Sequence, residues 1–220
     1  MVIQGFDFSG FPGRDAENLR RLNYAGRVEW FRYRFNLVFL TPFRRLVELE
    51  GPDCYIWLCV MTLCGAAIHA LANLTLGRGS DHEKFTSFLN TYLPTFSRAD
   101  FELNDPRAGR PNDVARTPAE HFYKFFRNGL AHSFCIEWGG VQHREEIPQI
   151  GLDYLFQTTQ GFHGEHGLGV VPREFVRDFE IACERLLVAF STAEPGDRIH
   201  ETFDQTFNRV FLGKARAPLP

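Results

Sequence analysis

Apolar side chains recur at every third or fourth position along much of this chain, and that spacing predicts amphipathic helices. Helices are predicted over residues 15–24, 26–40, 80–93, 172–192 and 197–211. Ser80 and Glu83 form a capping box at the start of one helix, and Pro94 ends it. Residues 31–39 also alternate in polarity, so a strand is the competing prediction there. After Thr41-Pro42 the helix continues or restarts as far as residue 50.

Residues 54–76 form a further helical stretch that contains no Asp, Glu, Lys or Arg. Its length is sufficient to cross a bilayer, so a membrane span is one alternative. We expect a central helix of a bundle and no membrane instead. Small and polar residues such as Gly65, His69 and Asn73 interrupt the apolar surface, and no cluster of Lys or Arg flanks the stretch.

The spacing of apolar residues changes from helical to alternating after residue 134. Residues 134–138 and 141–144 are predicted to pair as a β-hairpin around the turn Gly139-Gly140, with a further short strand near 154–156. Residues 161–169 hold four glycines together with His163 and His166. Two histidines three positions apart can chelate a metal, but a surface connector is the favoured interpretation of a segment this rich in glycine.

We therefore expect a single domain over residues 1–220 that is all-α apart from the small hairpin. An irregular N-terminal arm is predicted over 1–13, a polar loop over 102–116, and the hairpin with its Gly/His-rich insertion over 134–170. The arm has neither the basic start nor the apolar core of a signal peptide.

Composition and charge restrict the function further. The five cysteines are odd in number and lack CxxC spacing, which argues against a disulfide scaffold or a metal cluster and favours a cytoplasmic location. A net charge of −3 argues against generic nucleic-acid binding by the whole surface. Residues 18–45 nevertheless carry seven arginines and one acid, interleaved with aromatic residues. That composition is typical of an RNA-contacting surface, although a merely solvated helix face is the favoured interpretation.

The most informative helix spans residues 122–134 and has a well-marked start. Thr117 and Glu120 form a second capping box, and Pro118 fits the first helical position. At about 100° per residue, one side of this helix is apolar and carries the residues Phe122, Phe126, Leu130, Ser133 and Phe134. The other side carries the polar residues His121, Lys124, Arg127, Asn128 and His132.

Three of these polar residues have complementary chemistry. Asn128 and His132 are four positions apart and therefore lie on one line of the helix, which Arg127 flanks. The guanidinium of Arg127 suits a phosphate, and the imidazole of His132 can accept and return a proton near neutral pH. Because only one of the three is a good metal ligand, we expect neither a metal nor another cofactor here.

The motif Arg127-Asn128-x-x-x-His132 resembles the signature of the HEPN superfamily, and the surrounding residues 125–134 are similar to that family's motif helix. The helical segments from about 27 to 93 have the family's order, whereas the hairpin and the Gly/His-rich stretch have no counterpart in it. The resemblance implies an all-α, HEPN-like helical bundle. It also implies a metal-independent endoribonuclease in a toxin–antitoxin or phage-defence system, with RNA as substrate and an antitoxin protein as partner.

In the chemistry implied by this resemblance, the RNA 2′-hydroxyl attacks the adjacent phosphate. His132 acts as general base or acid, Arg127 stabilises charge at phosphorus, and Asn128 orients His132 or the phosphate. The motif helices of two protomers face each other in a homodimer and supply two Arg and two His. Lys124 and His121 are candidates for substrate binding. The lone histidine of the apolar helix, His69, is a candidate to support the site.

Two alternatives belong to other functional classes. One is a HEPN-like module that binds RNA, a nucleotide or a protein without cleaving. The other is a structural or regulatory protein with no role on nucleic acids, for which the mild overall acidity is the supporting feature.

Overall fold

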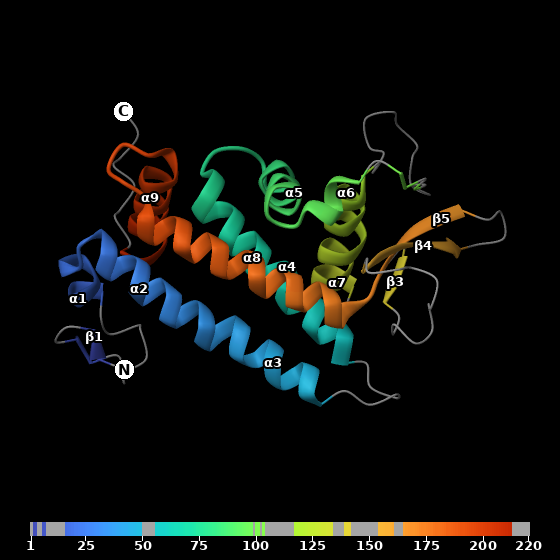
Figure 1. Cartoon of the computed structure of the whole chain (residues 1–220), viewed down its shortest axis with the longest axis horizontal. Coiled ribbons are helices and arrows are strands. Elements are labelled where there is room, and N and C mark those ends of the chain that lie inside the picture. Colours follow the sequence, from blue (N-terminus) through green and yellow to red (C-terminus); the bar gives the residue numbers. More distant parts are fainter. Residues whose placement is uncertain are drawn as a thin grey trace.

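The computed structural model describes residues 2–3, 6–7, 16–49, 56–98, 100–101, 103, 117–133, 139–141, 154–160 and 165–212. Side chains are described for most of these residues, but not for 2–3, 6–7, 16–17, 131–133, 139–141, 158–160 or 165. The described chain is mostly helical, as predicted (Figure 1). Nearly all of the predicted polar loop 102–116, and the segments 134–138 and 142–150, lie outside the described residues.

The helical elements follow the order that the hydrophobic pattern predicts. They are α1 (Ala16–Arg21), α2 (Tyr24–Phe35), the π turn η2 (Asn36–Leu40), α3 (Thr41–Glu48), α4 (Ile56–Leu76), α5 (Asp81–Tyr92), the 3₁₀ turn η3 (Pro94–Ser97), α6 (Pro118–His121), the π turn η4 (Phe122–Arg127), α7 (Asn128–Ser133), α8 (Pro172–Thr192) and α9 (Arg198–Phe211). The predicted capping box of Ser80 and Glu83 is confirmed at the start of α5. Within the predicted irregular arm, β1 (Val2–Ile3) and β2 (Phe6–Asp7) pair as two short antiparallel strands.

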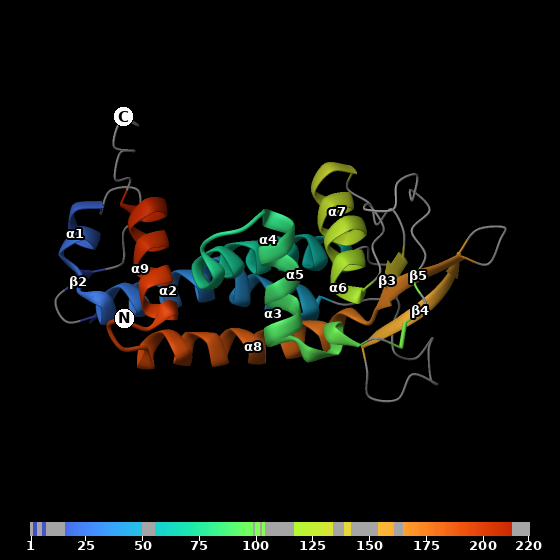
Figure 2. The same ribbon diagram turned by 90° about the horizontal axis from the view of Figure 1, so that it is seen from above.

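Helix α4 is the central element of the fold. It contacts α3, α5, α8, α9 and the motif segment η4–α7, so the prediction of a central helix is confirmed. Helix α8 and the α2–α3 segment run along the length of the molecule, with α1 and α9 at one end and the strands β3–β5 at the other (Figures 1 and 2). By length and composition alone α4 is also apolar enough to cross a membrane, and 50% of its apolar window is buried inside the protein.

The segment from α2 to α3 forms one continuous helix, so the alternative of a strand over 31–39 is wrong. Thr41 has helical backbone angles (φ −64°, ψ −46°), and its N–H donates to the carbonyl of Asn36, five positions back. Pro42 has no N–H, and a proline ring within a helix crowds the carbonyl four positions earlier. The wider π turn η2 lets the helix pass through Pro42 without a break.

A small three-stranded sheet in the order β3-β5-β4 packs beside the helices. Strands β4 (Leu155–Gln160) and β5 (Glu165–Val170) form an antiparallel hairpin, and β3 (Gly139–Val141) pairs in parallel with β5. A hairpin therefore follows the motif helix, but it is not the predicted one. Gly139 and Gly140 lie in a strand rather than a turn, because β5 supplies the parallel partner that local sequence does not indicate.

The prediction of a connector over 161–169 is also wrong in part, since His166 lies within β5. His163 lies outside the described residues. The strand predicted near 154–156 is confirmed by β4. Gly169 of β5 allows close packing across this hairpin, because a Cβ at that position would overlap the ring of Phe156 at 2.2 Å.

Candidate functional site

The motif helix begins as predicted. The N–H of Thr117 donates to Glu120 Oε2 at 2.9 Å, and the N–H of Glu120 donates to Thr117 Oγ1 at 3.3 Å. Pro118 occupies the first turn, where its missing N–H has no helical acceptor to satisfy. The capping box therefore fixes where the helix starts and, with it, the position of each later residue.

The middle of the motif helix is the π turn η4, which the sequence does not predict. The N–H of Asn128 donates to the carbonyl of Tyr123, five positions back. Buried aromatic rings hold one side of this turn, with Phe122 and Phe126 stacked at 5.1 Å between ring centroids. Single π turns inside α-helices occur frequently at functional sites. Here the turn ends on Arg127, the first residue of the motif.

The π turn also explains a wrong prediction. His121, a predicted substrate-binding residue on the polar side, is fully buried, with its ring 5.1 Å from that of Phe125. In an ideal helix His121 and Asn128, seven positions apart, share one face. The wider turn between them breaks that seven-residue relation, so His121 faces the core whereas Asn128 stays partly exposed.

Arg127 is held in place by three neighbours. Its Nη1 donates to Asn128 Oδ1 at 2.7 Å, and its Nη2 lies 3.0 Å from His69 Nδ1. Its guanidinium carbon lies 5.6 Å from the centroid of the Tyr123 ring, within the range of a cation–π interaction. A guanidinium has five N–H donors, so among the described residues these two bonds leave three for a ligand.

Because a guanidinium can only donate, the contact with Arg127 makes His69 Nδ1 an acceptor and puts the imidazole proton on Nε2. His69 Nε2 lies 3.6 Å from Asp81 Oδ1, and Asp81 pairs with Lys84 at 3.3 Å. Burial lowers the pKa of His69, the carboxylate of Asp81 opposes this shift, and the charges of Arg127 and Lys84 add to it. His69 is therefore neutral at neutral pH, as its acceptor role requires.

The contact between Arg127 and His69 depends on close packing between α4 and η4. A Cβ on Gly65 would lie 3.4 Å from Arg127 Cγ, so the stem of Arg127 runs directly against the backbone of α4. His69 lies one turn further along the same helix face. Glycine at position 65 thus lets the guanidinium reach His69.

The structure brings some of the predicted site residues together and leaves others apart. Arg127, Asn128 and His69 form one hydrogen-bonded group. His69 was predicted to support the site, and it contacts Arg127 directly. Asn128 contacts Arg127. Lys124 is partly buried, with Nζ 5.7 Å from the centroid of the Phe125 ring. The backbone of His132 lies in α7, but its side chain lies outside the described residues.

Sequence reasoning missed the polar residues around Arg127 and His69, namely Tyr123, Asp81, Lys84 and Asn73. Lys84 Nζ donates to Asn73 Oδ1, which joins α5 to α4. The four-residue spacing of His69 and Asn73 on an otherwise apolar helix was the one available signal. Across the described part of the chain, no group of three or more His, Cys, Asp or Glu side chains is placed to hold a metal ion.

Comparisons with models of protein families, with curated proteins and with solved structures find no match for this chain.

Proposed function

We propose that this protein is a HEPN-like, metal-independent endoribonuclease. The observation that carries the proposal is the fixed position of Arg127. Its guanidinium is bonded at both terminal nitrogens by His69 and Asn128 and keeps three donors for a phosphodiester. A cation that is already oriented stabilises developing negative charge at little reorganisation cost, which is the usual basis of electrostatic catalysis.

In the proposed reaction the RNA 2′-hydroxyl attacks the adjacent phosphorus. His132 removes the 2′-hydroxyl proton as the 2′-oxygen–phosphorus bond forms, while Arg127 stabilises the non-bridging oxygens. The bond from phosphorus to the 5′-oxygen breaks, and that oxygen receives a proton. The products are a 2′,3′-cyclic phosphate and a 5′-hydroxyl.

One histidine cannot easily serve both ends of this displacement. We therefore propose a homodimer in which the motif helices face each other, so that a second His132 protonates the leaving 5′-oxygen. His69 has a different role in this scheme. Its Nδ1 is occupied by Arg127 and its pKa is lowered by burial, so it positions the arginine and does not transfer the proton.

The test is cleavage of single-stranded RNA by the purified protein in EDTA. His132→Ala is expected to lower the rate by about 10²-fold or more, the usual scale for removing general acid–base catalysis. Arg127→Ala is expected to lose a comparable factor, and Arg127→Lys to recover only part of it because a point charge lacks the bidentate geometry. Arg185→Ala, on an exposed position of α8, is the matched control and should cleave like the parent.

Two further measurements test the proposed nucleophile and the proposed dimer. A 2′-deoxyribose at the cleavage position should block the reaction, because it removes the nucleophile. Light scattering should give the mass of a dimer, and a monomer with full activity would exclude the shared cleft. If His132→Ala cleaves as fast as the parent while RNA still binds, the nuclease proposal fails and the binding module replaces it.

A further inference from the structure

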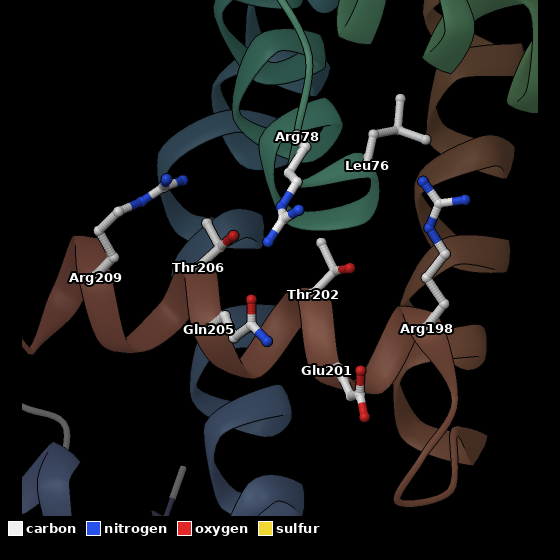
Figure 3. Close-up of a pocket in the computed structure, with 9 residues that line it drawn as sticks. Leu76, Arg78, Arg198, Glu201, Thr202, Gln205, Thr206 and Arg209 are labelled. Atoms are coloured by element: carbon white, nitrogen blue, oxygen red, sulfur yellow. The ribbon is translucent and has the colours of Figure 1, made fainter.

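A pocket of about 470 Å³ lies between the C-terminal end of α4, the turn that follows it, and α9. It is separate from the Arg127 site and has a strongly polar lining. The residues that define its chemistry are Arg78, Arg198, Thr202, Gln205, Thr206 and Arg209 (Figure 3). Three of these six carry a positive charge.

The amphipathic pattern of α9 explains why this lining is polar. Arg198, Thr202, Gln205 and Arg209 are separated by four, three and four residues, so they lie on one face of the helix. The opposite face carries buried rings, including that of Phe203, which anchor α9 in the core. Core packing therefore turns the polar face toward the pocket.

The third arginine comes from the turn after α4. Gly77 has φ +66°, a conformation that glycine adopts without strain, and the N–H of Arg78 donates to the carbonyl of Leu76 at 2.8 Å. A Cβ on Gly77 would lie 3.0 Å from Thr202 Cγ2, so this turn packs directly on α9. The turn thereby brings Arg78 over the polar face of α9, as Figure 3 shows.

The charge of the pocket is not neutralised within the described part of the chain, where Arg78, Arg198 and Arg209 form no ion pair. Glu201 also borders the pocket, but its carboxylate lies below the α9 ribbon in Figure 3, whereas the three guanidinium groups lie above it. The Thr202 hydroxyl and the Gln205 amide add donors. Since none of the described residues that line the pocket is aromatic, they offer no surface on which a base can stack, and their chemistry suits phosphate rather than nucleobase.

We infer that this pocket binds the backbone phosphates of an RNA strand whose scissile phosphate lies at Arg127. The identity of the ligand as RNA rests on the proposed function. His69 and Leu76 are seven residues apart on one face of α4, so they lie about 10 Å apart along the helix axis. Thr206, in the pocket lining, donates to the carbonyl of Asn73 at 3.2 Å, between these two positions. A few extended nucleotides cover that distance.

The experiment measures binding of fluorescent single-stranded RNA by anisotropy in EDTA, over a series of KCl concentrations. Every 2′-hydroxyl of the strand is methylated, so the strand cannot be cleaved and binding is measured independently of catalysis. The test variant combines Arg78→Ala, Arg198→Ala and Arg209→Ala. The control combines Arg173→Ala, Arg177→Ala and Arg185→Ala, three exposed arginines of α8 with the same total charge. Thermal melts confirm that both variants fold.

The pocket variant is expected to weaken binding of a 12-nucleotide strand by at least about tenfold at low salt. It should also reduce the slope of log K against log salt by about 2, because each phosphate contact on a single strand contributes roughly 0.7. The α8 control should change affinity less than about twofold. A dinucleotide has a single phosphodiester and cannot occupy both sites at once, so it should bind the parent much more weakly than the 12-nucleotide strand does.

Two outcomes would overturn the inference. One is an equal loss in both triple variants, which reflects net charge alone. The other is that the parent binds inorganic tripolyphosphate and the pocket variant does not, while neither tripolyphosphate nor the pocket substitutions change RNA affinity, which assigns the pocket to a free phosphoanion. The nuclease proposal fails separately: a parent protein that binds methylated RNA through the pocket but never cleaves unmodified RNA refutes catalysis and leaves the RNA site standing.

Discussion

The two π turns in the described part of the chain, η2 and η4, have the same backbone hydrogen bonding but different surroundings. In η2 the helix adapts to Pro42, and the turn leaves Leu37 and Val38 exposed at 54% and 43%. In η4 no proline lies in or directly after the turn, and the aromatic residues on its inner side are buried. The outer side of η4 ends at the hydrogen-bonded group around Arg127.

The difference shows that one π turn has a local cause and the other a tertiary one. A proline suffices to explain η2, because its ring and missing N–H disturb the preceding turn in any surroundings. At η4 the wider turn is maintained by packing on one side and by Arg127 with its partners on the other. Three predictions test this distinction, beginning with the largest expected effect.

Phe126→Ala is expected to lower the free energy of unfolding by about 3–5 kcal/mol, because the ring is buried in η4 and stacks on Phe122. Phe39→Ala in η2 is the matched control. Its ring is only partly buried, so the loss should be clearly smaller, about 1–2 kcal/mol. Urea unfolding of both variants measures the difference. Equal losses would contradict the tertiary origin of η4.

Pro42→Ala is expected to raise the free energy of unfolding by about 1–2 kcal/mol. Alanine restores an N–H donor and removes the ring, a change worth about 3 kcal/mol within a helix, and greater freedom of the unfolded chain offsets part of this gain. Pro118→Ala is the control, because a proline in the first turn is already compatible with a helix, and a change of at most about 0.5 kcal/mol is expected. A Pro42→Ala protein that unfolds at lower urea than the parent would show that η2 is also held by tertiary contacts.

Much of the helical fold could be predicted from the sequence because its signals are local. Capping boxes depend on residues three positions apart, and the apolar stripes of α5, α8 and α9 reflect which side meets the core. The π turn η4 could not be predicted in this way. A helical wheel assumes a constant 100° per residue, so the prediction placed His121 with Asn128, although packing had inserted a wider turn between them.

The residues of the candidate site also separate into those with a local sequence signal and those that only tertiary packing brings together. Arg127 and Asn128 were found because they are neighbours in the sequence, whereas the contact of Arg127 with His69 joins residues 58 positions apart. Asp81 is indicated locally only as the residue after a helix cap, and its approach to His69 depends on how α5 packs against α4. The strand at Gly139 was missed for the same reason, since its partner β5 is distant in the sequence.

The third prediction concerns pH and is the smallest in size. The pKa of His69 is lowered from its ordinary value of 6.5, mainly by burial, so the folded protein binds fewer protons than the unfolded chain between the lowered pKa and 6.5. The contribution of neutral His69 to stability is therefore fully present above pH 6.5 and is lost as the pH falls below it. Protonation also removes the acceptor at Nδ1 and puts a cation beside Arg127, with Lys84 adding to the repulsion and Asp81 alone opposing it.

Urea midpoints measured between pH 5 and 8 for the parent and for His69→Gln isolate this contribution. The difference between the two curves should be constant above pH 6.5 and should shrink in acid, because glutamine does not titrate. His200→Gln is the control, since His200 stacks on Tyr24 and is not part of the hydrogen-bonded group around Arg127. Below pH 6.5, protonated His69 no longer accepts a hydrogen bond from Arg127, so the guanidinium should be less firmly positioned. The proposed binding of RNA by the parent should therefore weaken in acid more than binding by His69→Gln. Parallel curves for parent and His69→Gln would mean that folding leaves the pKa of His69 unchanged, which would contradict the neutral acceptor role assigned to it beside Arg127.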